Sequence, residues 1–493
     1  MKRSLKLLDW MFRSPVALIS AGLFGIFIAV VSGHLFSIDG LQYYRVAERM
    51  AFDRSLVFDT PLIWGAPIAH PITPIGYSLA QVPAVLLAGW ARPLQPAFGS
   101  TPYDMALLYG DPVYTLSSWV NPLLVALTGG LTFRTAEALG VSKRLAMTVA
   151  LATILGSPLF FYARADFAQP LTTFLMLGIV AMLIDTFQRR RVAPGVMTVA
   201  VALAILTRPV DGAIIAFVAL VVLALPLGDW QPLKDGRRQA VQVVLGTLVG
   251  LVVMGVVDAI RFGSPFNPGY GADWGGSIPL NLLGETLGPG RGLVWYFPLV
   301  LLAPAGAWVL WRRGVRHEVA ILVLPVLLYL PMYAKFISLG GWDWGPRYLV
   351  PLVPLLGLLA SSVALTSRSR TATVLIVVAA IGGGLTNLAH LAVDPLQGFW
   401  AVYGNTQLGM PQFWLQFNLD SFPLIGIWHW YNASAGPDIM WLRLAGSTHG
   451  ASLIVFATLL AMGVLAFIRA WRLSHSACAT ESLSTPILEP EYE

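Results

Sequence analysis

Long apolar runs that lack the polar stripe of a surface helix recur along the chain. Residues 15–36 and 240–260 are two examples, and each is long enough to cross a hydrocarbon layer of about 30 Å as a helix. The pattern predicts an all-α polytopic membrane protein with about twelve transmembrane helices. We expect the spans at residues 15–36, 113–133, 145–162, 168–187, 192–208, 211–228, 240–260, 293–311, 319–334, 348–366, 371–391 and 451–468.

The composition agrees with a membrane protein, because 56% of the 493 residues are hydrophobic and 11% are charged. That charged share is about half of what a soluble domain carries. The first apolar run is about twenty residues long and no small-residue cleavage site follows it, so it predicts an uncleaved span rather than a secretory signal. The single cysteine, Cys478, allows no intramolecular disulfide.

The basic residues predict which side of the membrane each loop faces. Together, the two termini and the short loops 134–144, 189–191, 234–238, 312–316 and 368–370 hold 20 of the 31 Lys and Arg residues. Short basic loops belong on the cytoplasmic side, so we expect both termini there, in an inner or plasma membrane. The basic residues are spread over many loops, which does not favour a nucleic-acid partner.

The apolar segment 75–90 does not fit this alternation as a span. If it crossed the membrane, every later basic loop would face outward. We therefore expect 75–90 to be an interfacial or re-entrant helix in the first external loop.

Three large loops, 37–112, 261–292 and 392–450, are predicted on the external side. This side and its membrane boundary hold 15 of the 25 acidic residues and eleven Lys and Arg. External basic residues run against the orientation bias and need a local reason. Two reasons stay open, ion pairs within folded loops and an anion-binding site.

Asp39 stands where the first span leaves the membrane, in Ser37-Ile38-Asp39-Gly40. A short helix is expected from about residue 41, so Asp39 is a candidate N-cap. It is equally a candidate general base, because a partly desolvated carboxylate can take a proton from an acceptor hydroxyl. The residues alone leave both readings open.

An acidic residue after the first span, followed by a Tyr-rich juxtamembrane helix, resembles the GT-C superfamily of membrane glycosyltransferases. More narrowly, it resembles the branch of protein O-mannosyltransferases and aminoarabinose transferases. Segments 69–77, 157–171 and 340–351 are similar to further blocks of that branch, and the resemblance covers roughly residues 10–360. Two positions depart from the pattern. Ala168 stands where many relatives carry an acid, and Gly40 rather than a second carboxylate follows Asp39.

The resemblance implies sugar transfer from a polyprenyl-phosphate-linked donor to a glycan, lipid or protein acceptor on the external face, because no nucleotide sugars occur there. Asp39 would be the catalytic base of an inverting displacement, and positive charge would neutralise the leaving phosphate. The candidates for that charge are Arg347, Arg291 and Lys335, and the candidate pocket residues are His70, Tyr43, Tyr44, Arg164, Asp166, Gln169, Trp342, Asp343 and Tyr348.

Each candidate cation also has a structural reading. Lys335 at a span end can extend its amine to the interface, Arg347 can pair with Asp343, and Arg291 can orient a turn. No His and carboxylate residues show metal-ligand spacing, so the use of a divalent metal stays open. Membrane lipids are expected partners.

Two other classes compete with the enzyme. A secondary transporter or lipid flippase also has about twelve spans, but it places ionisable residues near the membrane midplane, and the span middles here contain none. A non-catalytic scaffold of the same fold is the third class. We expect three regions, a GT-C-like catalytic region at 1–366, C-terminal helices with an aromatic loop at 367–470, and a disordered cytoplasmic tail at 471–493. Gly246 and Gly250 predict close helix packing.

Overall fold

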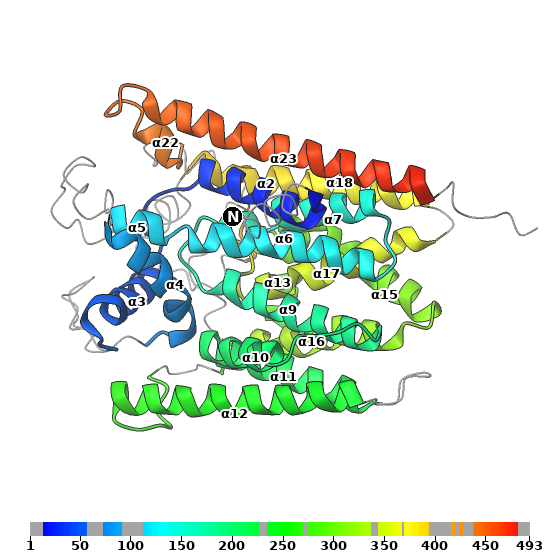
Figure 1. The fold of residues 1–493 in the computed structure, drawn as a ribbon, viewed down its shortest axis with the longest axis horizontal. Coiled ribbons are helices and arrows are strands. Elements are labelled where there is room, and N and C mark those ends of the chain that lie inside the picture. The colour runs from blue at the N-terminus through cyan, green and yellow to red at the C-terminus, as the bar shows by residue number, and fades with distance from the viewer. Residues whose placement is uncertain are drawn as a thin grey trace, which may run out of the picture.

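The structure is a computed structural model, and it describes residues 13–56, 72–90, 112–225, 234–269, 274–336, 344–366, 369–393, 416–419, 422, 424–426 and 437–481. The described residues form helices and connecting segments without a strand, which confirms the all-α prediction. The long helices lie side by side in one bundle (Figure 1).

Each expected span coincides with one helix or with two or three consecutive helices. These are α2 (Pro15–Ala29), α5 (Pro112–Ser117) with α6 (Val120–Ala138), α7 (Lys143–Leu155) with α8 (Leu159–Tyr162), α9 (Gln169–Phe187), α10 (Val196–Thr207), α11 (Pro209–Ala224), α12 (Lys234–Phe262), α14 (Leu293–Tyr296) with η3 (Pro298–Leu302) and α15 (Ala303–Arg312), α16 (Arg316–Ala334), η4 (Arg347–Leu352) with α17 (Val353–Ser361) and η5 (Ser362–Leu365), α18 (Ser369–Leu388) with η6 (Ala389–Leu391), and α23 (Ala451–Glu481).

Seven of the described helices are long and apolar enough to cross a membrane, and further apolar helices of 10–17 residues lie among them. The chain is therefore a multi-pass membrane protein. The number of twelve spans is compatible with this set and stays a prediction.

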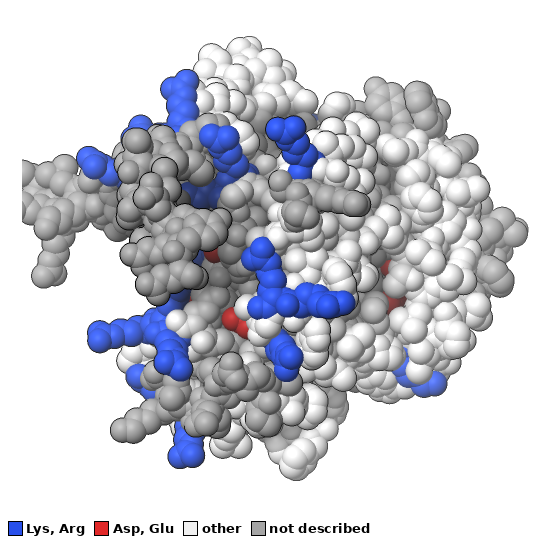
Figure 2. Space-filling model, turned by 90° about the vertical axis from the view of Figure 1, so that its right-hand side faces the viewer, with Lys and Arg blue, Asp and Glu red and all other residues white. Residues whose placement is uncertain are grey.

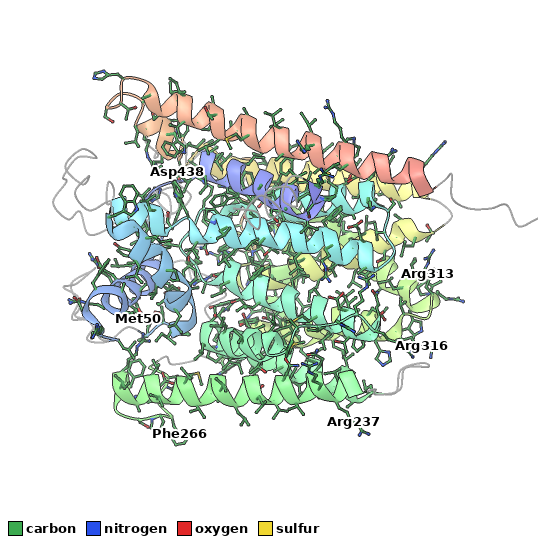
Figure 3. The ribbon with its side chains drawn as sticks, viewed as in Figure 1. Met50, Arg237, Phe266, Arg313, Arg316 and Asp438 are labelled. Carbon is green, nitrogen blue, oxygen red and sulfur yellow. The ribbon has the colours of Figure 1, made fainter. Side chains whose placement is uncertain are left out.

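The two ends of the bundle differ in charge. Arg237, Arg313 and Arg316 lie at one end, whereas Asp438 and Met50 lie at the other (Figure 3). Viewed from the end that carries the three arginines, the surface shows many Lys and Arg side chains and few Asp and Glu (Figure 2). We call this the basic end and the opposite one the site end.

Small residues allow close contacts between helices that are far apart in the sequence. A Cβ on Gly463 of α23 would lie 2.8 Å from the carbonyl oxygen of Gly22 in α2. A Cβ on Gly246 of α12 would lie 2.6 Å from the carbonyl oxygen of Thr198 in α10, and one on Gly250 would lie 3.0 Å from Ile205. The predicted packing role of Gly246 and Gly250 is therefore confirmed.

The predicted first external loop forms a small group of helices at the site end, next to the bundle (Figure 1). Its described helices are α3 (Ile38–Glu48), η1 (Arg49–Asp53), α4 (Ile75–Ala88) and α5. Helix α4 has 14 residues and belongs to the same class of shorter apolar helices as α2, α10 and α11, so its length alone does not separate it from the expected spans. Its Tyr77, Ser78 and Gln81 are buried. The interfacial reading of 75–90 stays a prediction.

The predicted C-terminal tail needs a correction at its start. Helix α23 continues to Glu481, so residues 471–481 are helical rather than disordered. The reason is local, because no Gly or Pro occurs between Gly463 and Glu481 to end the helix. Residues 482–493 lie outside the described part of the chain. Two short helices remain, α13 (Ile278–Leu287) before α14 and α22 (Met440–Arg443) before α23.

Candidate functional site

The first pair of the candidate site joins Asp39 and Arg347, which are 308 positions apart in the sequence. Arg347 Nη2 lies 2.5 Å from Asp39 Oδ2, and the side chains are 16% and 35% exposed. The Arg347 guanidinium also lies over the ring of Phe167, 4.3 Å from its centroid. A carboxylate and a guanidinium that both reach solvent are thus held together at the site end.

Local sequence explains the position of Asp39. Helix α3 is capped by Ser37, whose side chain accepts a hydrogen bond from the amide of Gly40. The cap is therefore Ser37 rather than Asp39, and the Asp39 carboxylate is not needed to cap the helix. It lies in the first turn of α3, where the helix dipole favours negative charge.

Asp166 lies directly against the same turn. A Cβ on Gly40 would lie 1.4 Å from Asp166 Oδ2, so only glycine leaves room for this carboxylate. Asp166 Oδ1 accepts a hydrogen bond from the amide of Phe36 at 3.0 Å, whereas the buried Oδ2 has no hydrogen-bond partner. Burial raises the pKa of the Asp166 carboxyl to about 7. In the sequence, Gly40 follows Asp39 in place of a second carboxylate. In the structure, the Asp166 carboxylate lies against Gly40 and so next to Asp39.

Two pairs of tyrosine rings pack α3 against α4 and α5. The rings of Tyr43 and Tyr77 meet edge to face with centroids 5.1 Å apart, and those of Tyr44 and Tyr114 do the same at 5.1 Å. Both Tyr43 and Tyr44 are buried. They form the packing surface between α3, α4 and α5 and so determine where Asp39 lies.

Tyr348, next to Arg347, belongs to an aromatic stack that contains an arginine the sequence analysis missed. Its ring stacks on Tyr333 with centroids 4.7 Å apart. The Arg208 guanidinium lies 5.4 Å from both ring centroids and 3.0 Å from the Asp211 carboxylate. The signal that could have found Arg208 is the i,i+3 pair with Asp211 at the external end of a predicted span.

Lys335 is one of the residues that line an apolar groove of about 830 Å³. The groove is also lined by residues of α11, α13 and α16 and by Trp274. The Lys335 side chain is exposed, and its Nζ lies 3.5 Å from the carbonyl oxygen of Gly276. The next residue, Phe336, stacks on Tyr333 of the aromatic stack beside Arg347.

Arg164 lies in a second charge cluster, in which Arg164, Asp438 and His34 are buried and Arg443 is partly exposed. Its Nη2 is 3.0 Å from Asp438 Oδ2, and Asp438 Oδ1 accepts from His34 Nε2 at 2.8 Å and from Arg443 Nη1 at 2.5 Å. Burial raises the pKa of Asp438, but the surrounding His34, Arg164 and Arg443 lower it more, so the net pKa is well below its usual range. This cluster ties residues near α22 to the turns before α3 and α9, and the sequence analysis missed Asp438, His34 and Arg443.

Arg291 and Gln169 are both buried. Arg291 lowers the pKa of the neighbouring Glu285, but burial raises it more, to about 8. Gln169 is the first residue of α9, and its Oε1 has no hydrogen-bond partner. Neither side chain is as accessible as Asp39, and their predicted roles stay predictions.

Three predicted pocket residues, His70, Trp342 and Asp343, lie outside the described residues. The described ranges contain no group of three or more His, Cys, Asp or Glu side chains that could hold a metal ion. Trp344, the first described residue of segment 340–351, is buried. Its carbonyl oxygen accepts a hydrogen bond from Tyr162 Oη at 3.2 Å, and its Nε1 donates one to Asn387 at 3.2 Å.

Comparisons with known proteins gave matches among solved structures. No family model and no curated protein matches the chain. The structure is similar to that of ArnT from Cupriavidus metallidurans bound to undecaprenyl phosphate, with 18% identity and a TM-score of 0.49 over 95% of this chain and 78% of that chain. It is likewise similar to the apo state of that protein, with 17% identity, a TM-score of 0.49 and coverage of 93% and 76%.

Proposed function

We propose that the chain is a glycosyltransferase that moves a sugar from a polyprenyl-phosphate-linked donor to an acceptor hydroxyl at the site end of the bundle. The observation that carries this proposal is the solvent-reaching pair of Asp39 and Arg347. It brings together the two groups that such a transfer requires, a base for the acceptor and a cation for the departing phosphate.

Asp39 is the general base of this proposal. Its side chain is 35% exposed and does not serve as the helix cap, so it can approach an acceptor hydroxyl. Asp166 beside it has a pKa raised to about 7 by burial, so near neutral pH a large part of it is protonated. Asp39 can then act as a carboxylate without a second full negative charge next to it.

The donor phosphate would be held by Arg347, together with Lys335, which lines the apolar groove. The groove of about 830 Å³ is lined almost entirely by apolar side chains, which suits an isoprenoid chain. A guanidinium offers two parallel donors to phosphate oxygens. Binding of the phosphate to Arg347 would loosen its contact with Asp39, and the base would become available only when the donor is in place.

The orientation of the chain is part of the proposal. The basic end carries Arg237, Arg313 and Arg316 and would face the cytoplasm, which places Asp39 on the external face. Nucleotide sugars are absent there, so a lipid carrier supplies the donor. Direct attack at the anomeric carbon by one base would invert its configuration.

The decisive measurement is sugar transfer from labelled polyprenyl-phosphate sugars in membranes that contain the wild type or the Asp39→Asn variant. We expect the variant to lose about 10²-fold or more of the rate, as removal of a general base does. The anomeric configuration of the product, read by NMR, tests the predicted inversion.

The matched control is Asp53→Asn, in the same loop. Asp53 pairs with Arg49 on the surface, with both side chains 47% exposed, so this change should leave transfer unaffected. An Asp39→Asn variant that folds and transfers at the wild-type rate contradicts the base assignment. Transfer from none of the tested lipid donors by the wild type contradicts the enzyme class.

A further inference from the structure

Most basic side chains at the site end have an acidic partner. Arg45 pairs with Glu48, Arg49 with Asp53, Arg164 and Arg443 with Asp438, Arg208 with Asp211 and Arg347 with Asp39. Ion pairing therefore explains why these basic residues lie at the site end, although the positive-inside bias favours basic residues on the cytoplasmic side. Arg261 is not among these ion pairs, and the charge of Asp258, one turn earlier in α12, acts on it electrostatically.

Arg261 is a buried cation whose donors are only partly used. It lies in the last turn of α12 and is 4% exposed. Its Nη1 donates to the carbonyl oxygen of Thr73 at 2.8 Å, whereas Nε and Nη2 have no hydrogen-bond partner in the part of the chain that the structure describes. Buried donors without an acceptor are costly and rare, so these two nitrogens point to a ligand.

A cavity of about 40 Å³ adjoins this guanidinium. Since one water needs about 10–15 Å³ by the same kind of measure, the space suits the oxygens of one tetrahedral anion. Its wall includes Thr73, whose buried hydroxyl also has no hydrogen-bond partner, and Ile75, the first residue of α4. The first turn of a helix offers free amide donors and a partial positive charge.

The position of the cavity indicates where the anion comes from. Helix α12 lies at the edge of the bundle, with the rest of the helices on one side of it (Figure 1). Its outward residues, among them Leu248, Val252, Val256 and Ile260, are exposed and apolar. Acyl chains would cover this face, and Arg261 at the external end of α12 lies at the depth of lipid headgroups.

We propose that Arg261, Thr73 and the first turn of α4 form a binding site for the phosphate group of an anionic membrane lipid. The site shares no lining residue with the groove at Lys335, and it holds α4 against α12 when occupied. Asp258 lines the same cavity and opposes an anion electrostatically. The negative charge of Asp258 lowers the affinity of the site for an anion. Removing that charge therefore tests whether the bound group is negative.

The experiment uses the full chain, purified in a neutral detergent and titrated calorimetrically with short-chain phosphatidic acid, with phosphatidylcholine of the same chain length and with inorganic phosphate. We expect phosphatidic acid to bind more tightly than either of the others. Arg261→Gln should weaken its binding about tenfold or more, because a charge-assisted hydrogen bond is lost. Arg261→Lys keeps the charge but not the planar fork, and should give an intermediate affinity.

One arginine variant serves as the control. Arg237→Gln removes the same charge from the opposite end of α12 and should leave the binding of phosphatidic acid unchanged. Because the measurement is binding and not transfer, its result is independent of the proposed glycosyltransferase activity.

Asp258→Asn keeps the proposal testable even if Arg261→Gln does not fold. A phosphate site predicts several-fold tighter binding of phosphatidic acid in Asp258→Asn, because a like charge is removed. Unchanged affinity in a folded Arg261→Gln variant, or weaker binding in Asp258→Asn, overturns the proposal. Equal affinity for inorganic phosphate and phosphatidic acid overturns the lipid source.

Discussion

Two Asp and Arg pairs at the site end have the same chemistry and opposite surroundings. Asp39 and Arg347 are 35% and 16% exposed, whereas the side chains of Asp438 and Arg164 are 1% and 0% exposed. An exposed ion pair contributes about 0–1 kcal/mol to stability, and breaking a buried one costs about 3–5 kcal/mol. The first pair can therefore open for a substrate, while the second holds the chain together.

The surrounding charges sharpen this difference. Among the described residues, Asp438 contacts three basic side chains and Asp39 contacts one. Asp166 is a third case, because it is buried like Asp438 but lies against the backbone of Gly40 and Phe36 instead of a cation. Its pKa is raised, whereas that of Asp438 is lowered. Burial without a bonded cation thus raises the pKa of a carboxyl, whereas burial beside several cations lowers it.

The largest expected effect comes from Asp438→Asn. The change leaves Arg164 buried without its counterion, and we expect a loss of about 3–5 kcal/mol in the free energy of unfolding. Thermal unfolding in detergent measures it, with Asp53→Asn as the exposed control, for which the change should stay within about 1 kcal/mol. A loss no larger than that of the control would mean that the cluster does not anchor the chain.

An effect of intermediate size is expected from the pH dependence of Asp166. Its pKa is about 7 in the folded state and about 4 when unfolded, so the folded state binds more protons between these values. The contribution of Asp166 is fully present below about pH 4 and is lost as the pH rises through about 7. The unfolding temperature of the wild type should therefore fall over this window relative to Asp166→Asn. Parallel curves for the two proteins would show that the carboxyl is not protonated in the fold.

The smallest effect on stability is expected from Arg347→Gln, about 1 kcal/mol or less, because the pair reaches solvent. Its effect on transfer should nevertheless be large, about 10²-fold, since the cation that stabilises the leaving phosphate is lost. Rates and unfolding temperatures of the same preparations separate the two effects. Arg347→Lys should recover part of the rate. A variant that loses stability in proportion to activity would mean that Arg347, like Arg164, mainly stabilises the fold.

The main features of the fold follow from the sequence. The apolar runs predict where the helices lie, because a helix in lipid satisfies its own backbone hydrogen bonds. The alternation of basic loops predicts that 75–90 is not a span, and this stays a prediction. The helical extension to Glu481 was missed, because polar residues were read as disorder although nothing in them ends a helix.

The site was only partly predictable. Asp39, Arg347, Lys335 and Asp166 were candidates from the sequence, and their roles stay predictions. The contact between Asp39 and Arg347 was not predicted, because the sequence offered only the neighbouring Asp343 as an alternative partner of Arg347. Asp438 carries no local signal at all, since its contact with His34 spans 404 positions.

The sequence by itself determined the helices, the basic and site ends, and the set of ionisable groups at the site end, because hydropathy and charge act locally along the chain. Tertiary structure alone decided which carboxylate meets which cation and how much water reaches each pair. Asp39 and Asp438 look alike in the sequence. Burial separates them, and burial depends on helices that are hundreds of residues apart.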